Sequence, residues 1–212
     1  MTAPPPNSAF VGALILGAGK SARMGRPKLL LPWHGTTVLG HLIQQWKRLS
    51  VEQIAVVCAA GDAALQQELD RLEFPIPARI HNPEPDRGMF SSIQCAAAWT
   101  GWNGILTHWA IVLGDQPHLR ENTLRAVLDF SAAHPQKVCS PKQRGHRRHP
   151  VMLPQIAFER LATSGAANLR EFLLSCEEAH CDLQDPGLEL DIDHPEDYEK
   201  ALKLGMLYKP VG

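Results

Sequence analysis

The chain has 212 residues, of which 44% are hydrophobic and 20% are charged, and its formal net charge is -1. This size and composition are those of a globular protein with one sizeable core, which excludes intrinsic disorder and favours a single domain. The near-neutral charge gives no sign of a nucleic acid or an anionic membrane as partner, and no apolar run has the length of a membrane-spanning helix.

The predicted elements alternate between strands and helices. Residues 1–8 (MTAPPPNS) are expected to be a flexible leader, and residues 9–212 a single domain. The first half predicts a strand at 9–16, a helix from about 37, a strand from 54, a helix at 62–72 capped by Asp62, a weaker strand at 78–81, a helix at 91–99 and a central strand at 108–115. The second half predicts a helix at 121–133, a strand near 137, two short helices within 155–174 and a helix after 195. This alternation predicts an α/β fold, a three-layer α/β/α sandwich with a mostly parallel sheet.

Three polar motifs follow predicted strands or lie near the end of the chain. They are the loop at 17–28, the pair Gly114–Asp115 and the segment Asp191-Ile192-Asp193. Ligands of open parallel sheets bind outside the carboxyl ends of the strands, so we expect these motifs to form one site.

The loop at 17–28 (GAGKSARMGRPK) is rich in glycine and in basic side chains. It carries Lys20, Arg23, Arg26 and Lys28, whereas the first acidic residue of the chain is Glu52. This excess of positive charge suits a small, highly anionic ligand, because backbone amides and fixed cations both stabilise phosphate oxygens. We therefore expect the loop to bind a nucleoside triphosphate.

Two other phosphate-binding motifs fit this loop less well. An ATPase P-loop needs a glycine five residues before Gly19, where the chain has Leu14 inside the predicted strand. Residues 17–22 match the G-x-G-x-x-A form of a dinucleotide-binding turn, but that turn also needs an acidic residue about 20 positions further on, which the chain lacks. A nicotinamide dehydrogenase is therefore a remote alternative.

The carboxylates of the other two motifs are candidate metal ligands. Asp115 directly follows a predicted buried strand, and one or two carboxylates together with phosphate oxygens suffice to bind Mg²⁺. On an extended segment Asp191 and Asp193 face the same side. Asp191 is favoured as the second ligand, whereas Asp193 is either a ligand or the cap of the helix that follows.

The stretch LGAGKSARMGRPKLLLPWHGTTVL at residues 16–39 resembles the signature loop of the MobA-like nucleotidyltransferases. The segments GMFSSI at 88, VLGDQP at 112, RHPVML at 148 and LDIDHPEDY at 190 resemble further motifs of that family, in the same order. Within the family the sequence is most similar to the molybdenum cofactor cytidylyltransferases. The resemblance implies a Rossmann-like fold of the nucleotide-diphospho-sugar transferase type. It also implies transfer of CMP from CTP to the phosphate of molybdopterin, with release of pyrophosphate, and a need for Mg²⁺, with Mn²⁺ as a possible substitute.

The resemblance also implies roles for individual residues. Arg23 is expected to hold the β- and γ-phosphates, Lys28 the α-phosphate, and Asp115 the metal. The nucleotide is expected to bind at Leu16, Gly17, Ala18, Gly19, Ser91 and Ser92, and the anionic acceptor at His149 and Pro150. Ser91 and Ser92 also suit the N-cap of the helix that they precede.

Several alternatives stay open at this point. The acceptor can be a sugar 1-phosphate or another phosphorylated compound, and GTP can replace CTP, although the methyl group of Ala18 favours CTP. A carrier or chaperone that binds nucleotide or molybdopterin without turnover is the non-enzymatic alternative, and a molybdoenzyme or a maturation protein is a possible partner. Five scattered cysteines without a CxxC pair favour a reducing, cytoplasmic location.

Overall fold

The computed structural model describes residues 9–19 and 24–207, which form a layered α/β fold around a central sheet. This sheet has eight strands in the order β10-β7-β9-β6-β1-β4-β5, and β8 pairs with β7 outside this path. Its strands are β1 (Val11–Leu16), β4 (Gln53–Ala59), β5 (Arg79–Asn82), β6 (His108–Leu113), β7 (Val138–Gln143), β8 (His146–Arg147), β9 (Val151–Pro154) and β10 (Glu178–Asp182). A separate hairpin joins β2 (Pro32–Trp33) to β3 (Thr36–Thr37).

The sheet is mostly parallel. Strand β1 lies in its centre and pairs in parallel with β4 and β6, and β5 and β10 extend the sheet by parallel pairing with β4 and β7. Strand β9 runs the other way and separates β6 from β7. The carboxyl ends of β1, β4, β5, β6, β7 and β10 therefore share one edge, and the loop before β9 reaches the same edge.

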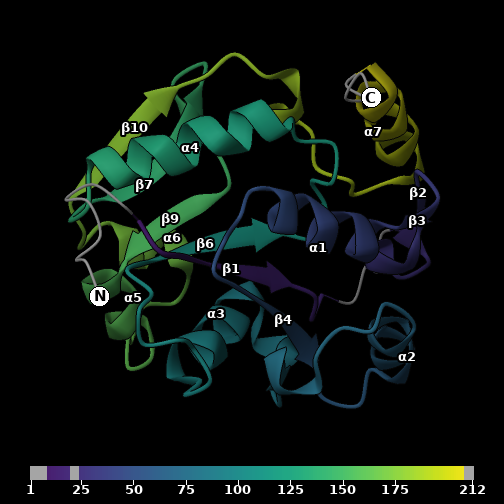
Figure 1. Cartoon of the computed structure of the whole chain (residues 1–212), viewed down its shortest axis with the longest axis horizontal. Coiled ribbons are helices and arrows are strands. Elements are labelled where there is room, and N and C mark those ends of the chain that lie inside the picture. The colour runs from purple at the N-terminus through teal and green to yellow at the C-terminus, as the bar shows by residue number, and fades with distance from the viewer. Residues whose placement is uncertain (1–8, 20–23, 208–212) are drawn as a thin grey trace.

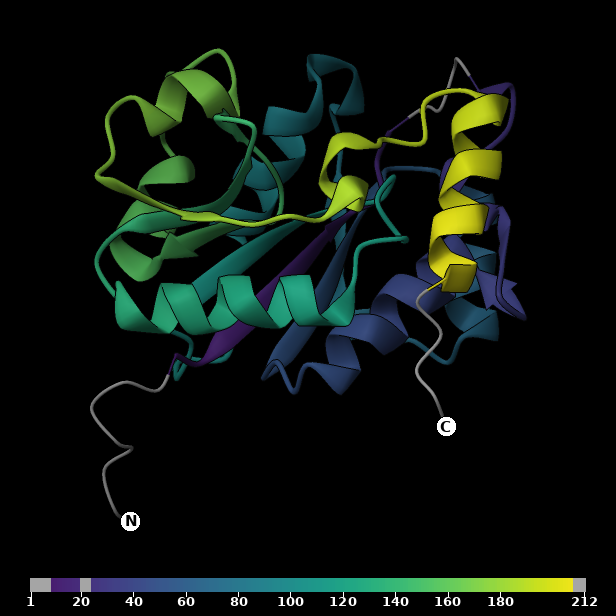
Figure 2. The same ribbon diagram turned by 90° about the horizontal axis from the view of Figure 1, so that it is seen from above.

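Helices cover both faces of the sheet, as Figures 1 and 2 show. They are α1 (Val38–Arg48), α2 (Ala63–Arg71), α3 (Met89–Ala98), α4 (Glu121–Ala133), α5 (Gln155–Leu161), α6 (Leu169–Leu173) and α7 (Pro195–Leu207). Short 3-10 turns are η2 (Lys28–Leu30), η3 (Ile76–Ala78), η4 (Pro85–Arg87) and η5 (Pro186–Glu189). Helices α1 and α4 pack on one face, and α3 and α5 on the other. The predicted three-layer sandwich is confirmed.

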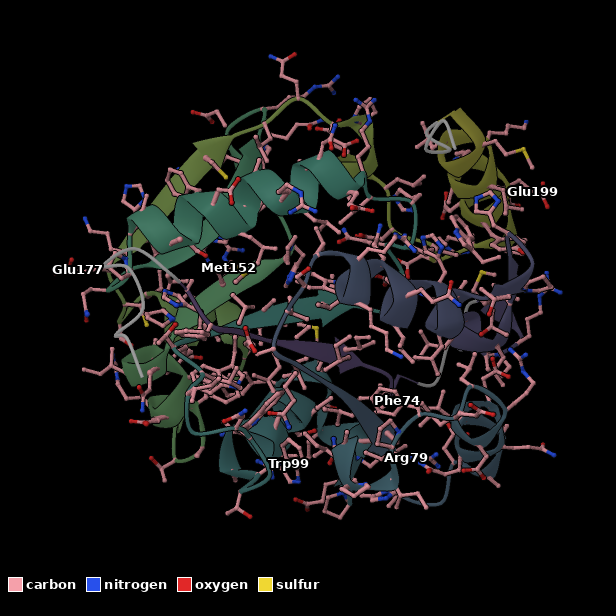
Figure 3. The ribbon with its side chains drawn as sticks, in the orientation of Figure 1. Phe74, Arg79, Trp99, Met152, Glu177 and Glu199 are labelled. Carbon is pink, nitrogen blue, oxygen red and sulfur yellow. The ribbon has the colours of Figure 1, made fainter. Side chains whose placement is uncertain are left out.

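Strand β1 is buried because its side chains enter two separate cores. Ala13 and Ile15 join the core beneath α1 and α4, whereas Leu14 joins the core beneath α3 and α5, and all three are fully buried. Met152 of β9 is fully buried in the same core as Ala13 and Ile15. By contrast, Glu177 and Glu199 lie at the periphery of the molecule (Figure 3). An unbroken apolar run with both faces buried is the pattern expected for a central parallel strand.

The helix starts follow the local sequence, with one difference from prediction. Thr37 Oγ1 accepts a hydrogen bond from the Gly40 amide at the start of α1, and Asp62 caps α2 as predicted. Helix α3 begins at Met89 after Gly88, so Ser91 and Ser92 lie inside its first turn instead of at its N-cap. Gly88 has a φ of 88°, a backbone conformation that favours glycine, and this fixes the start of the helix two residues early.

The structure adds elements that the sequence pattern did not predict. Strand β10 is half-exposed at one edge of the sheet and contains no apolar alternation. At the other edge, the Arg79 guanidinium donates to the Phe74 carbonyl at 2.6 Å and pairs with Asp70 at 2.7 Å, which anchors β5 to the end of α2 (Figure 3).

In the described ranges, no helix combines the length and the apolar surface that a membrane crossing requires.

Candidate active site

Three charged side chains from distant parts of the chain meet at the carboxyl edge of the sheet. Lys28 is held by the turn η2 after β1, Asp115 follows β6, and Asp193 precedes α7. The Lys28 Nζ lies 2.7 Å from Asp193 Oδ1 and 3.6 Å from Asp115 Oδ2. The ammonium group therefore bridges two carboxylates that are 78 positions apart in the sequence (193 against 115).

Burial and neighbouring charge perturb the Asp115 carboxyl. Burial raises the pKa of Asp115 to about 6, and the nearby Asp191 carboxylate adds to the rise, while the Lys28 ammonium opposes it. The Oδ1 atom of Asp115 is buried and has no hydrogen-bond partner within the described residues. A buried carboxylate oxygen that lacks a donor is an energetic cost that a bound cation would remove.

The segment at residues 191–193 turns its two carboxylates toward different partners. Asp191 Oδ1 accepts a hydrogen bond from Gln116 Nε2 at 2.8 Å, and the Ile192 amide donates to the Asp115 carbonyl at 3.0 Å. Ile192 is buried in the core and anchors the segment. Asp193 is held by Lys28, so the segment between η5 and α7 is tied to both of the other motifs.

A cavity of about 410 Å³ lies beside these carboxylates. Its wall is formed by residues that follow β1, β5 and β6: Leu16, Ala18, Gly19, Pro85, Asp86, Gly88, Met89, Ser92, Leu113, Gly114 and Asp115. The predicted nucleotide-binding residues Leu16, Ala18, Gly19 and Ser92 thus line one space together with Asp115. Gly17 is buried behind it, where a Cβ atom would lie 2.9 Å from the Val57 carbonyl oxygen.

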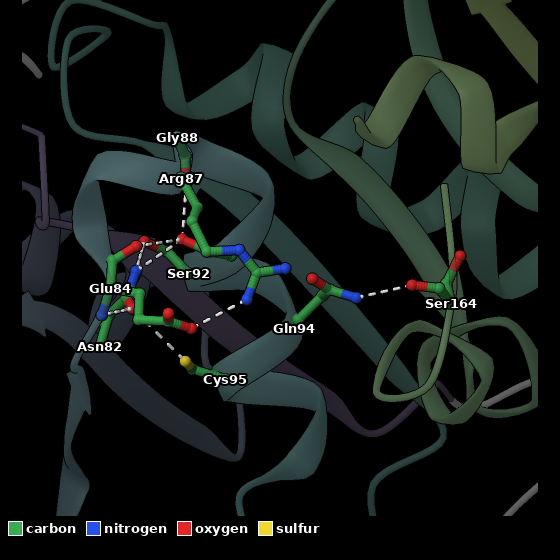
Figure 4. A network of polar contacts seen from close by, with 9 residues as sticks. Asn82, Glu84, Arg87, Gly88, Ser92, Gln94, Cys95 and Ser164 are labelled. Atoms are coloured by element: carbon green, nitrogen blue, oxygen red, sulfur yellow. Dashed lines mark hydrogen bonds and ion pairs between the residues drawn. The ribbon is translucent and has the colours of Figure 1, made fainter. Parts of the chain in front are cut away.

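A hydrogen-bond network shapes the wall formed by residues 82–92 (Figure 4). Asn82 is fully buried, and its Nδ2 donates to Ser91 Oγ at 2.8 Å and to Ser92 Oγ at 2.9 Å. Its Oδ1 accepts from the Glu84 amide at 2.8 Å. Ser91 Oγ also contacts the Gly88 carbonyl at 2.8 Å, so Ser91 supports the loop from behind while Ser92 lines the cavity.

A second cavity, of about 610 Å³, lies next to the first, and Met89 lines both. It is bordered by Lys142, Gly145, His146, Arg147, Arg148, His149, Val151, Leu169, Arg170, Leu173, Leu174 and His180. Burial lowers the pKa of His149 to about 4, so this side chain is neutral at pH 7. Pro150 is buried and lines a separate, small internal space, so only His149 of this predicted pair faces the larger cavity.

The carboxylates of Asp115, Asp191 and Asp193 suit a divalent cation. Within residues 9–19 and 24–207, no three His, Cys, Asp or Glu side chains surround a common point. Asp115 and Asp193 nevertheless already flank one positive charge, that of Lys28, and Asp191 is close enough to Asp115 to raise its pKa. Because Mg²⁺ takes one or two carboxylates and completes its shell with phosphate oxygens and water, these residues fit such an ion.

Sequence reasoning placed most of these residues but missed two. Gln116 donates a hydrogen bond to Asp191 and follows Asp115 directly in the sequence. Its position next to a predicted metal ligand is the one sequence feature that could have marked it as part of the site. Asn82 ends a strand and precedes a proline, and nothing local distinguishes it from a turn residue. Arg23 lies outside the described residues.

Comparison with known proteins connects this geometry to a family. Residues 13–180 match the family model of the MobA-like NTP transferase domain. The chain belongs to the MobA-like NTP transferase family. It is 26% identical over 193 residues to the molybdenum cofactor cytidylyltransferase of Escherichia coli K12, and the match covers 90% of this chain and 95% of that protein.

Solved structures agree with the family. Rv0371c from Mycobacterium tuberculosis H37Rv is 25% identical and superposes with a TM-score of 0.69 over 92% of this chain and 99% of that one. A structure of Rv0371c in complex with manganese has a TM-score of 0.66 at 22% identity, with the same coverage of both chains. The resemblance to the MobA-like family is confirmed, and the protein is a nucleotidyltransferase.

Proposed function

We propose that this MobA-like protein transfers CMP from CTP to the phosphate of molybdopterin in a Mg²⁺-dependent reaction that releases pyrophosphate. The observation that carries the proposal is the meeting of Lys28, Asp115 and Asp193 beside a cavity that the loop after β1 also lines. A cation and carboxylates at one end of a nucleotide-sized space are the groups that transfer from a triphosphate requires. The similarity to the E. coli cytidylyltransferase supports this choice of substrates.

The chemistry needs positioning and charge more than it needs a base. An oxygen of the acceptor phosphate attacks the α-phosphorus of CTP, the new P–O bond forms, and the bond to the β-phosphate oxygen breaks as pyrophosphate leaves. The attacking oxygen is already anionic at neutral pH, so no side chain has to remove a proton. Lys28 exchanges its carboxylate partners for the α-phosphate and neutralises charge that grows as the leaving group departs.

The metal would be held by Asp115 together with Asp191 or Asp193. A divalent cation at this place supplies positive charge between the phosphates and fixes their orientation. Manganese bound to the Rv0371c protein supports a divalent ion in this fold. Asp115 is suited to the task, because an ion would compensate the buried and unpartnered Oδ1 atom.

The larger cavity suits the acceptor because of its mixture of side chains. One wall is apolar and includes Met89, Leu169 and Leu173. Another part of the lining is cationic and is formed by Lys142, Arg170, Arg147, which pairs with Glu178, and Arg148, which pairs with Glu189. Among the described lining residues there is no Asp, Glu, Asn or Gln, the side chains that accept hydrogen bonds from sugar hydroxyls. A flat ring system with an anionic phosphate therefore fits this space better than a sugar 1-phosphate does.

The decisive experiment is a matrix of nucleotides and acceptors, assayed by pyrophosphate release. CTP with molybdopterin should give the highest turnover, and Lys28→Met and Asp115→Asn should each lower it by roughly 100-fold or more. Lys200→Met is the matched control, because Lys200 is an exposed lysine on α7 that pairs with Asp197. Near-normal turnover of both site variants, or a preference for another acceptor, would contradict the proposal.

Separate variants test the two binding cavities. Arg148→Ala should raise the KM for the acceptor and leave the KM for CTP unchanged. Arg125→Ala should change neither, because Arg125 is an exposed arginine of α4 that pairs with Glu121 away from the cavity. Ala18→Gly should relax the discrimination against GTP, since it removes a methyl group from the wall of the nucleotide cavity. We also propose a cytoplasmic location, which the five free cysteines support.

A further inference from the structure

The loop at 24–33 and the helix α7 are joined through one aromatic side chain. Tyr198 of α7 is buried, with 7% of its surface exposed, and its hydroxyl donates a hydrogen bond to the Pro32 carbonyl. The Arg26 guanidinium carbon lies 5.9 Å from the centre of its ring, and the Trp33 ring lies 6.3 Å away on the hairpin. Tyr198 thus contacts the chain on both sides of Lys28, two residues before it and four residues after it.

Short and ordered links connect Tyr198 to Asp193 and Pro32 to Lys28. The Tyr198 amide donates to the His194 carbonyl at 3.2 Å, and the His194 amide donates to Asp197 Oδ2 at 3.1 Å, so the first turn of α7 closes directly after Asp193. On the loop side, the Leu31 amide donates to the Lys28 carbonyl at 3.1 Å. The bond between Tyr198 and Pro32 therefore fixes the distance between Asp193 and Lys28 from outside the cavity.

We propose that Tyr198 is a positioning residue that keeps the Asp193 carboxylate at the metal site when Lys28 leaves it. The inference rests on the proposed function, in which Lys28 turns from Asp193 to the α-phosphate once nucleotide and metal bind. At that moment Asp193 loses a partner 2.7 Å away. The Tyr198–Pro32 bond does not involve either charged group, so it survives the exchange and holds the carboxylate in place for the cation.

The docking of α7 as a whole does not depend on this hydroxyl. Ala201 is fully buried one turn further along the helix. At Gly205 an added Cβ atom would lie 2.8 Å from His34 Nε2 and 3.1 Å from Trp33 Cζ2, which shows how closely the helix packs on the hairpin. Removing the Tyr198 hydroxyl should therefore release the local alignment of Asp193 while the helix stays docked.

The test is calorimetric titration of Mn²⁺ into protein mixed with a non-hydrolysable CTP analogue. Tyr198→Phe should weaken Mn²⁺ binding by roughly tenfold, the scale of one hydrogen bond. The matched control is Ser131→Ala, which removes a similar hydroxyl-to-carbonyl bond of 2.8 Å in α4, away from the site. The control should lower the unfolding temperature about as much as Tyr198→Phe does and should leave Mn²⁺ affinity unchanged.

A double variant separates positioning from a merely structural role. In an Asp193→Asn background, Tyr198→Phe should cause no further loss of Mn²⁺ affinity, because the carboxylate that it positions is gone. Arg26→Gln removes the cation that lies over the Tyr198 ring and so loosens the ring that carries the hydroxyl. It should weaken Mn²⁺ binding less than Tyr198→Phe does and should likewise lose its effect in the Asp193→Asn background. It decides the question if Tyr198→Phe does not fold.

The outcomes distinguish this inference from the proposed function. If wild-type protein binds no Mn²⁺ with the nucleotide, or if Asp115→Asn leaves Mn²⁺ affinity unchanged, the proposed metal site is wrong and the inference with it. If Asp115→Asn weakens binding but Asp193→Asn does not, Asp193 is not a ligand and the inference is overturned while the proposed function stands. If Asp115→Asn and Asp193→Asn weaken binding but Tyr198→Phe behaves like Ser131→Ala, the metal site stands and the positioning role of Tyr198 is overturned.

Discussion

Asp115→Asn should make the metal-free protein more stable while it removes activity. The carboxylate is held at a buried position beside Asp191, and the Lys28 ammonium compensates it only in part. An amide has nearly the same shape and carries no charge, so the folded state no longer has to keep an ionised group in this place. A gain in stability on removing a side chain is the signature of a residue that is retained for function.

The pKa of Asp115 gives the size and the pH dependence of this effect. Its pKa rises from 3.8 to about 6 on folding, and about two units correspond to about 3 kcal/mol of unfolding free energy at neutral pH. A raised carboxyl pKa means that the ionised form destabilises the fold. The cost is fully present above pH 6 and disappears as the pH falls toward 3.8, so the advantage of the variant should shrink to about 1 kcal/mol at pH 4.5.

Urea unfolding of both proteins in EDTA, at pH 7.5 and at pH 4.5, measures this difference. Asp129→Asn on the exposed side of α4 is the control, and its effect should be within about 0.5 kcal/mol at both pH values. Saturating Mg²⁺ and CTP should then stabilise wild-type protein much more than the variant, since only wild type has the carboxylate that we propose binds the ion. The reasoning is refuted if the variant is less stable than wild type at pH 7.5, or if the gap is the same at both pH values.

Three further predictions concern other parts of the fold. Gly17→Ala should cost about 1–3 kcal/mol in urea unfolding, because its Cβ atom would lie 2.9 Å from the Val57 carbonyl, whereas Gly19→Ala, with nothing within 4 Å, should cost little. Burial lowers the pKa of His41 to about 4, so stability should fall as the pH drops from 6.5 to 4, and His41→Gln should remove about 3 kcal/mol of that loss in an acid titration followed by circular dichroism. Asn82→Ala should raise the KM for CTP several-fold and increase proteolysis at residues 83–88, since two serine hydroxyls of α3 and one loop amide each lose the hydrogen bond to Asn82.

The parts of the fold that the sequence predicted are those whose pattern is local. Strand β1 is an apolar run ended by glycine, and α2 begins at an aspartate that caps it, so each could be recognised within a window of about ten residues. Strand β10 could not be recognised in this way, because its residues (EAHCD) are half-exposed and its position is set by partners elsewhere. Its Glu178 pairs with Arg147, and His180 contacts Ser140 at 2.9 Å.

The site shows the same division between local and long-range information. Lys28 and Asp115 were predicted to share a site because each follows a central strand, and the structure brings them within 3.6 Å. The choice between Asp191 and Asp193 could not be made from their spacing. Their different partners, Gln116 and Lys28, come from other segments of the chain.

One reversed strand explains how the two cavities come to lie side by side. In a fully parallel sheet, only residues that follow strands reach the carboxyl edge. Strand β9 runs against β6, with Val151 paired to Ile111, so the residues that precede β9 arrive beside the end of β6 instead. His149 and the basic segment around it thereby reach the edge that carries Asp115, and the proposed acceptor cavity opens next to the proposed nucleotide cavity. Under the proposed function, the antiparallel strand therefore has a chemical consequence, because it places the cationic wall proposed for the acceptor against the carboxylates proposed for the metal and the nucleotide.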